Sequence, residues 1–265
     1  MMIKNCAVLT VAGSDPGGGA GIQADLKTFS ALGVFGTSVI TAVTAQNLDG
    51  VTAIQAVETD VVRKQLIAVL EGFPIKAVKT GMLYSAEIIH VIAGVLDGYR
   101  TIPLVIDPVF AATSGSPLIR EDAVAALTGK LFPRAALITP NMPETEILLG
   151  TQLETPGQLE KAAVKLFHRF HVPVLVKGGH LRDRGVDRAV DIFFDGEAIK
   201  TFESESITGV NNHGSGCTLA SAIAAALARG ESTVEAVNTA KKYITRALKN
   251  ALQLSSNLRV INHFP

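Results

Sequence analysis

The sequence predicts an α/β protein with a central, mostly parallel β-sheet flanked by helices on both faces. Short runs rich in β-branched residues alternate with amphipathic helical windows, the pattern of repeated βα units. Glycines and polar residues follow several of these runs, where a parallel sheet places its ligands. No Pro/Ser-rich or repetitive stretch divides the pattern, so we expect a single domain over residues 1–265.

The expected elements follow from local residue patterns. Helices are expected where apolar residues recur at helical spacing, over about 19–32, 59–72, 85–96, 121–129, 143–149, 156–169, 215–229 and 232–251. Strands are expected where β-branched and apolar residues cluster, near 7–12, 38–44, 75–79, 103–107, 136–139, 173–177, 190–194 and 198–202. The final stretch, SSNLRVINHFP, is interpreted as a tail or a late edge segment without a role.

Composition limits the function classes. Of the 265 residues, 48% are hydrophobic, enough for a large core. Lys+Arg and Asp+Glu both number 24, so no basic excess favours nucleic acid. Cys6 and Cys217 form no CxxC pair, which argues against a disulfide framework and a structural zinc site. Without an export signal or an apolar run of the ~20 residues that a membrane span needs, we expect a cytoplasmic protein with no membrane partner.

The strongest local signal is a glycine-rich turn that runs directly into an alanine-rich helix. It consists of Gly214, Ser215, Gly216 and Cys217, within ITGVNNHGSGCTLASAIAAALARG. Glycines let backbone N–H groups converge, and the helix N-terminus adds unpaired N–H groups and a positive dipole end. Such a turn favours an anion, most often a phosphate. A turn that only caps a buried helix is the alternative. Cys217 favours the functional interpretation, since a thiolate would be favoured at a helix start.

Spacing excludes two common nucleotide-binding loops. Gly209 and Gly214 have the glycine spacing of a Walker loop, but Ser215 stands where that loop needs Lys. The early stretch GSDPGGGAGIQADLKT, beginning at Gly13, contains five glycines before a helix, yet its spacing does not match GxGxxG. Neither a Walker loop nor a dinucleotide fingerprint is therefore expected.

Further candidate ligand groups follow the first three expected strands. Asp25 lies on the helix after the first strand, Gln46 follows the second and Met82 the third. A Gln amide donates and accepts hydrogen bonds at once, as an aromatic nitrogen ring with an amino group requires. A flexible thioether suits a flat ring. Solvated helix face, turn and core positions are the alternatives for these three residues.

Charged residues follow the later strands. Asp107 ends the fourth strand, and Asn141 and Glu144 lie three apart at a helix start. Glu144 either caps that helix or, beside Asp107, holds Mg²⁺ through water, since this ion takes one or two carboxylates. Both interpretations stay open at this point. Lys177 and Gly179 follow the sixth strand and together suit a phosphate.

Four motifs in order, GSDPGGGAGIQADLKT, TPNMPE, VKGGH and HGSGCT, make the sequence resemble the hydroxymethylpyrimidine and phosphomethylpyrimidine kinases of thiamine biosynthesis, in the ribokinase superfamily. The matches span nearly the whole chain. The resemblance implies a ribokinase-like fold and an ATP–Mg²⁺ donor, with a monovalent cation as a further candidate cofactor. It implies phosphoryl transfer to 4-amino-5-hydroxymethyl-2-methylpyrimidine and then to its monophosphate, by a homodimer.

The resemblance also implies residue roles. Cys217 stands where related sugar kinases have an aspartate base, and the glycine turn before it would form the anion hole. The implied substrate pocket consists of Gly13, Asp25, Gln46 and Met82. The implied metal site consists of Asp107 and Glu144. The implied nucleotide site consists of Asn141, Lys177 and Gly179. Ser215 departs from the pattern, since many members have Thr there, but it keeps the polar character.

Two rival interpretations remain. A pyridoxal kinase on the same fold also acts on a flat nitrogen ring with a hydroxymethyl group, although Gln46 and Asp25 favour the aminopyrimidine. A non-catalytic nucleotide-binding module is disfavoured because Glu144, Lys177 and Cys217 are all present.

Overall fold

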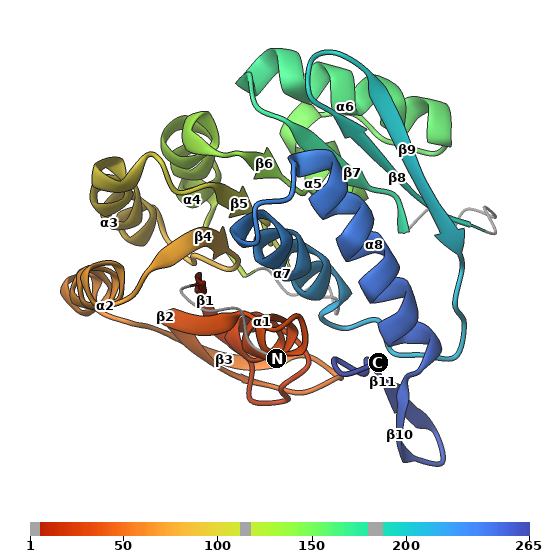
Figure 1. Cartoon of the computed structure of the whole chain (residues 1–265), viewed down its shortest axis with the longest axis horizontal. Helices are drawn as coiled ribbons and strands as arrows, with labels where there is room; N and C mark the ends of the chain where they lie inside the picture. Colours follow the sequence, from red (N-terminus) through yellow and green to blue (C-terminus); the bar gives the residue numbers. More distant parts are fainter. Residues whose placement is uncertain (1–5, 112–117, 180–187) are drawn as a thin grey trace.

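Among the residues that the structure describes, nine strands form one sheet in the order β3-β2-β1-β4-β5-β6-β7-β8-β9 (Figure 1). The computed structural model describes residues 6–111, 118–179 and 188–265. The strands from β2 to β7 in this order run parallel, while β3, β8 and β9 pair antiparallel with their neighbours. The strands are β1 Ala7–Ser14, β2 Phe35–Gln46, β3 Val51–Ala56, β4 Ile75–Thr80, β5 Leu104–Ile106, β6 Leu137–Ile138, β7 Val174–Lys177, β8 Arg188–Phe194 and β9 Ile199–Glu205.

Helices cover both faces of the sheet, which confirms the predicted fold class (Figure 1). One face packs against α1, α7 and α8, and the other against α2 to α6. The helices are α1 Gly21–Ala31, α2 Thr59–Gly72, α3 Ala86–Leu96, α4 Glu121–Ala126, α5 Met142–Leu149, α6 Pro156–Phe170, α7 Ser215–Ala228 and α8 Thr233–Lys249. None of the helices within the described ranges has both the length and the apolar character to cross a bilayer.

The alanine content of α7 explains its central position. Nine of its residues, from Thr218 to Ala226, are buried, so the helix has almost no solvent-facing side. Small side chains allow it to pack closely against α1, α8 and β4 at the same time. Its N-terminus is thereby held at the carboxyl end of the sheet, where the glycine-rich turn lies.

Strand β3 was not predicted from the sequence. It pairs antiparallel with β2 at the sheet edge, after a turn in which Asn47 Oδ1 accepts hydrogen bonds from the N–H groups of Asp49 and Gly50. No residue of β3 is fully buried. The strand therefore lacks the period-two alternation by which a half-buried strand is predicted.

The helix predicted over 121–129 is shorter than expected. The α-helical part, α4, ends at Ala126, and the chain continues as a π-helical turn, Leu127–Leu131, and a 3₁₀ turn, Phe132–Arg134. Pro133 lacks the N–H group that further helix would need. The apolar residues keep helical spacing throughout residues 121–134, so the sequence pattern does not show the change from an α-helix to π-helical and 3₁₀ turns.

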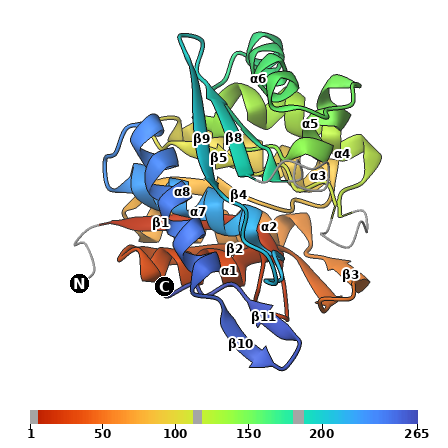
Figure 2. The same cartoon turned by 90° about the vertical axis from the view of Figure 1, so that its right-hand side faces the viewer.

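The C-terminal segment is built into the fold rather than being a loose tail. Leu252–Ser255 (β10) and Leu258–Val260 (β11) form a hairpin that extends beyond the end of α8 (Figure 2). The chain then returns, and His263 is buried, with Nε2 3.2 Å from Thr218 Oγ1 on α7. The Tyr243 hydroxyl of α8 donates a 2.6 Å hydrogen bond to the His263 carbonyl oxygen.

Candidate active site

A cavity of about 520 Å³ lies at the carboxyl ends of the parallel strands and reaches the N-terminus of α7. Ligands in open α/β sheets bind at this edge. All but one of the site residues predicted from the sequence line this cavity: Gly13, Gln46, Met82, Asp107, Asn141, Glu144, Lys177, Gly179, Gly214, Ser215, Gly216 and Cys217.

Asp25 is the exception, because its carboxylate is buried beneath the cavity wall and used by three neighbours. Lys79 Nζ lies 2.9 Å from both carboxylate oxygens. The hydroxyls of Thr10 and Ser221 donate hydrogen bonds of 2.5 and 2.6 Å. The structure thus places Asp25 where it joins α1 to β1, β4 and α7, not on the wall of the predicted substrate pocket.

The anion-hole turn depends on a close contact between two glycine-rich loops. Gly214 has a φ of +83°, and a Cβ on it would lie 1.7 Å from the Gly19 carbonyl oxygen. Only glycine fits there without moving the loops. A Cβ on Gly216 would lie 3.1 Å from Lys177 Nζ and 3.8 Å from Asp107 Oδ2. The first turn of α7 therefore brings its backbone N–H groups next to both a cation and a carboxylate.

Cys217 lies at this turn, but its environment does not favour a thiolate. Burial raises the pKa of its thiol to about 11, and the nearby charges of Asp25 and Asp107 act in the same direction. Lys79 lowers the pKa without offsetting these effects. The prediction that the helix start favours the thiolate is therefore wrong, because desolvation outweighs the modest effect of a helix dipole.

Lys177 at the end of β7 and Asp107 just after β5 form a nearly buried ion pair across the end of β6, which lies between these strands. Lys177 Nζ lies 2.6 Å from Asp107 Oδ1, to which the Thr139 hydroxyl also donates at 3.1 Å. Burial alone would lower the pKa of Lys177, but Asp107 and Glu144 raise it above its ordinary value. Lys177 is therefore a permanent cation beside Gly216.

Glu144 forms a capping box with Asn141, which confirms the capping interpretation. Its backbone N–H donates to Asn141 Oδ1 at 2.9 Å, and its Oε2 accepts from the Asn141 N–H at 2.7 Å. Burial raises the pKa of Glu144 to about 7; Lys177 lowers it and Asp107 raises it further.

The two carboxylates also suit a Mg²⁺ ion. Asp107 and Glu144 both line the cavity and share Lys177 as a cation, so negative charge is in excess. Within residues 6–111, 118–179 and 188–265, no group of three or more His, Cys, Asp or Glu side chains is placed to hold a metal. A pair of carboxylates is nevertheless the usual protein share of a Mg²⁺ site, which keeps several waters.

The part of the cavity wall around Gly13 and Met82 is suited to a flat ring. A Cβ on Gly13 would lie 3.1 Å from Met82 Sδ, so glycine leaves room for the thioether. Met82 is almost fully buried, and Gln46 lies half-buried at the end of β2. An apolar floor and one amide form this part of the wall.

Sequence reasoning missed Asp15 and His213, which join the two glycine loops. His213 Nε2 lies 3.0 Å from Asp15 Oδ2. Asp15 also accepts hydrogen bonds from the N–H groups of Gly17, Gly19 and Ala20. An Asp before Pro and several glycines is a turn signal in the sequence, but its contact with His213 joins residues that are 198 positions apart.

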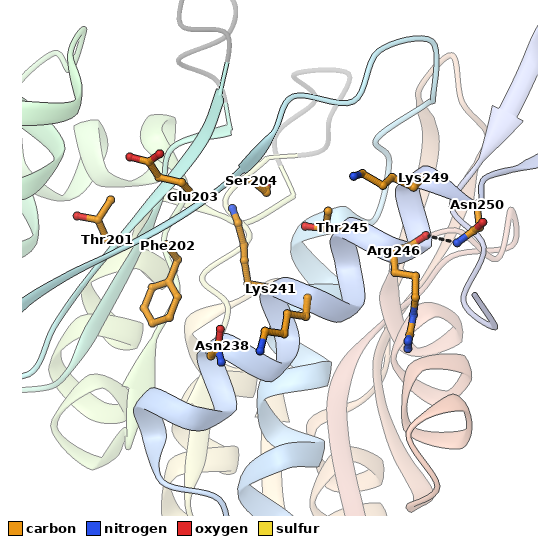
Figure 3. Close-up of a pocket in the computed structure, with 11 residues that line it drawn as sticks. Thr201, Phe202, Glu203, Ser204, Asn238, Lys241, Thr245, Arg246, Lys249 and Asn250 are labelled. Carbon is orange, nitrogen blue, oxygen red and sulfur yellow. Dashed lines mark hydrogen bonds between the residues drawn. The ribbon is translucent and has the colours of Figure 1, made fainter.

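A second groove, of about 480 Å³, lies between β9 and α8 (Figure 3). Its basic residues, Lys241, Lys242, Arg246 and Lys249, come from α8. Lys241 pairs with Asp191 at 2.6 Å, and Asp191 accepts the N–H of Gly178 at 3.0 Å. Ser204, Lys241 and Thr245 line both the groove and the main cavity, so the two hollows adjoin.

Comparison with known proteins shows the family of the chain. The phosphomethylpyrimidine kinase family model matches residues 15–262. A hydroxymethylpyrimidine/phosphomethylpyrimidine kinase of Rhizobium meliloti is 46% identical over 97% of this chain and 96% of its own. The thiamine biosynthesis bifunctional protein ThiED of Geobacter sulfurreducens is 49% identical over 97% of this chain, which spans 52% of that relative.

Solved structures lead to the same result. A Bacillus subtilis pyridoxal kinase in complex with ADP superposes with a TM-score of 0.87 at 35% identity, covering 97% of both chains. A phosphomethylpyrimidine kinase of Clostridium difficile superposes with a TM-score of 0.79 at 43% identity, covering 91% of this chain and 99% of its own. The chain is therefore a phosphotransferase with a ribokinase-like fold, and it belongs to the phosphomethylpyrimidine kinase family.

Proposed function

We propose that this enzyme transfers the γ-phosphoryl group of ATP to 4-amino-5-hydroxymethyl-2-methylpyrimidine and then to the monophosphate, giving the diphosphate used in thiamine biosynthesis. One observation carries the proposal. The first turn of α7, Lys177 and Asp107 meet around Gly216, and Gln46 and Met82 line the same cavity. A phosphate-binding end and an aromatic-ring end thus face one space.

The phosphate end supports transfer by charge stabilisation. Phosphoryl transfer passes through a loose transition state, so positioning and charge compensation dominate. The backbone N–H groups of Gly214 and Gly216 would bind the transferred phosphoryl oxygens, with Lys177 as a fixed cation. The N–H of Ser215 is not available for this role in the structure, because it donates to the Asn212 carbonyl oxygen at 3.0 Å. Asn141 and Gly179 lie on the same wall and extend the site for the donor phosphates. The apolar residues Ile207, Val210, Ile244 and Leu248 further along the cavity suit a purine ring.

Asp107 and Glu144 would hold Mg²⁺, directly or through water. When bound, the ion neutralises charge on the donor phosphates. Asp107 directs Oδ2 toward Gly216, while its Oδ1 is occupied by Lys177 and Thr139. The remaining carboxylate oxygen is thus the one near the phosphate end. A monovalent cation remains a further candidate cofactor.

Cys217 is the proposed proton acceptor for the hydroxymethyl group. As the substrate oxygen bonds to the γ-phosphorus, its proton passes to the Cys217 thiolate, and the bond to ADP breaks. Since the thiol pKa is about 11, only a small fraction of the enzyme carries the thiolate near neutral pH. A small thiolate fraction is compatible with turnover because the substrate hydroxyl keeps most of its proton until late in a loose transition state.

An ADP-release assay tests the proposal with the aminopyrimidine, pyridoxal and ribose side by side. We expect turnover with the aminopyrimidine at least ~10-fold above that with pyridoxal, in keeping with discrimination by one polar contact. Higher turnover with pyridoxal would instead support the rival ring substrate, and no ADP release with any alcohol would refute the kinase proposal. The proposal includes a homodimer in the cytoplasm, which sedimentation and fractionation of cells would test.

A further inference from the structure

The glycine turn before α7 ends an irregular segment that core packing does not hold. Between the end of β9 and Gly214, residues 206–213 are all half-buried or exposed. The helix that follows is buried from Thr218 to Ala226. A segment with few buried side chains opens more easily than the core next to it. The position of the turn therefore depends on specific contacts rather than on the packing of α7.

Steric contact with the loop before α1 limits how close the turn can approach. A Cβ on Gly214 would lie 1.7 Å from the Gly19 carbonyl oxygen, and a Cβ on Gly19 would lie 3.0 Å from His213 Cδ2. The helices that follow the two loops, α1 and α7, pack side by side (Figures 1 and 2). Steric contact alone does not prevent the turn from moving away, so an attractive contact is also required.

The hydrogen bond between His213 and Asp15 supplies this attraction. His213 Nε2 lies 3.0 Å from Asp15 Oδ2, and the two side chains are only 15% and 2% exposed, so little water competes for the bond. Asp15 is itself held by its own loop. Its Oδ1 accepts from the N–H of Gly17 at 2.8 Å, and its Oδ2 from those of Gly19 and Ala20 at 3.1 and 2.8 Å.

Asp15 is ionised, which makes the bond from His213 charge-assisted. Burial alone would raise the pKa of Asp15, but the hydrogen bonds from His213, Ala20 and Gly17 outweigh burial and hold the pKa well below its usual range. An ionised carboxylate has no proton to donate, so His213 donates through Nε2–H. Hydrogen bonds to an ionised acceptor are roughly twice as strong as neutral ones.

Both ends of this contact are anchored in the backbone. The Asp15 N–H donates to Gln23 Oε1 on α1 at 2.9 Å. The His213 N–H donates to Asn211 Oδ1 at 2.9 Å, and His213 directly precedes Gly214. A displacement of the His213 side chain is therefore passed to the Gly214 N–H group without an intervening residue.

We propose that Asp15 and His213 are positioning residues for phosphoryl transfer, whose hydrogen bond holds the N–H groups of Gly214 and Gly216 at the place of the transferred phosphoryl group. The inference rests on the proposed function and deepens it. In this role neither side chain contacts the reacting atoms; both act through the turn. Because the anion hole stabilises the transition state more than the bound substrates, loss of the contact should lower kcat and leave KM unchanged.

The first test removes the donor and leaves the loop of Asp15 intact. In His213→Ala we expect kcat with the aminopyrimidine alcohol to fall ~10- to 100-fold, the size expected for a small misplacement. KM for the alcohol and for ATP should stay within about twofold. His213→Gln places an amide N–H₂ group near the position of Nε2 and should recover most of kcat. Full activity of His213→Ala, or equal losses in both variants, would overturn the proposal.

Inhibition by ADP with aluminium fluoride, which mimics the transferred phosphoryl group, separates positioning from damage. A partly unfolded preparation has a lower kcat but an unchanged inhibition constant. In His213→Ala the inhibition constant should rise by the factor by which kcat/KM falls, since a transition-state mimic loses the same stabilisation. The affinity for ADP alone should not change. An inhibition constant equal to that of the unaltered enzyme would refute the positioning role.

A double-mutant cycle tests whether the two side chains act through one contact. Asp15→Asn should also lower kcat, and the double variant with His213→Ala should lose no more than the worse single variant, because residues in contact are not additive. Fully additive losses would contradict the inference. Lys27→Met is the matched control: Lys27 Nζ also binds this loop, at the Gly18 carbonyl oxygen 2.6 Å away, but the bond is exposed and does not involve the turn before α7. Its kcat should equal that of the unaltered enzyme, and a loss equal to that of His213→Ala would count against a specific role.

A crystal structure of the unaltered protein with ADP, aluminium fluoride and the alcohol gives a test that does not depend on any variant folding. His213 should remain within hydrogen-bond distance of Asp15, with the N–H groups of Gly214 and Gly216 directed at the fluoride. A broken contact in this complex would overturn the inference. Absence of turnover with the aminopyrimidine in the unaltered enzyme would instead refute the proposed function, so the two failures are distinguishable.

Discussion

Lys79 and Asp25 form an ion pair in which neither side chain reaches solvent, with Nζ 2.9 Å from each carboxylate oxygen. The pair joins β4 to α1, and the Ser221 hydroxyl connects it to α7. Burying two charges is costly unless each oxygen and proton has a partner, and here Thr10 and Ser221 complete the carboxylate. The pair lies close enough to Cys217 for both charges to affect its thiol.

Removing one member of this pair should destabilise the protein strongly. Lys79→Met or Asp25→Asn leaves an uncompensated buried charge, which costs about 3–5 kcal/mol in free energy of unfolding. Urea denaturation measures this loss, and the double variant should lose less than either single variant. Asp60→Asn, which breaks exposed pairs with Arg63 and Lys64, is the control and should change little. Equal small losses in all variants would contradict the assignment.

The pH dependence of turnover should follow the ionisation of Cys217. With a thiol pKa of about 11, the thiolate fraction rises nearly tenfold per pH unit below that value. We expect log kcat to rise with pH between 7 and 9 where chemistry limits turnover, and Cys217→Ala to lose ~10²–10⁴ in kcat together with this rise. A loss below threefold would show that Cys217 is not the base.

A side chain at Gly216 should abolish phosphoryl transfer without unfolding the protein. Gly216→Val places methyl groups where Lys177 Nζ is 3.1 Å from the Cβ position, in the space assigned to phosphate oxygens. We expect kcat to fall by more than ~10², the size found for loss of an anion-hole donor. Gly157→Ala, at an exposed helical site with nothing within 4 Å of its Cβ, is the control. Circular dichroism should show both proteins folded; full activity of Gly216→Val would refute the placement of the anion hole.

Dependence on Mg²⁺ should change with pH through Glu144. Its pKa of about 7 means that protons compete with the metal below neutral pH, so the Mg²⁺ concentration for half-maximal activity should fall as pH rises from 6 to 8. Glu144→Gln keeps an oxygen for the capping box but should need roughly tenfold more Mg²⁺ at pH 8, with little pH dependence. Metal titrations at fixed ATP measure both effects. An unchanged titration in the variant would exclude Glu144 from the metal site.

The fold and the cavity wall were largely predictable, because both depend on local patterns. Continuous apolar runs such as that of β1 mark strands buried on both faces, and residues directly after parallel strands necessarily meet at one edge. Lys177 and Asp107 were found in this way, whereas Gly216 was found from the glycine-rich turn that runs into an alanine-rich helix. Strand β3 was missed because an exposed edge strand has no buried face to produce a pattern.

Contacts between distant side chains were not predictable. The assignment of Asp25 to the substrate pocket followed the family motif, whereas its true neighbours, Lys79 and Ser221, lie 54 and 196 residues away. The thiolate preference of Cys217 was wrong because burial is a property of the whole fold. Asp15 was overlooked because its significance depends on His213, which no local pattern connects to it.

The burial of His263 against α7 has a practical consequence for protein engineering. Ile261 and His263 are both buried, so a substitution that shortens either side chain would open the packing next to Thr218, one residue after Cys217. Variants designed to probe the first turn of α7 should therefore leave these two residues unchanged.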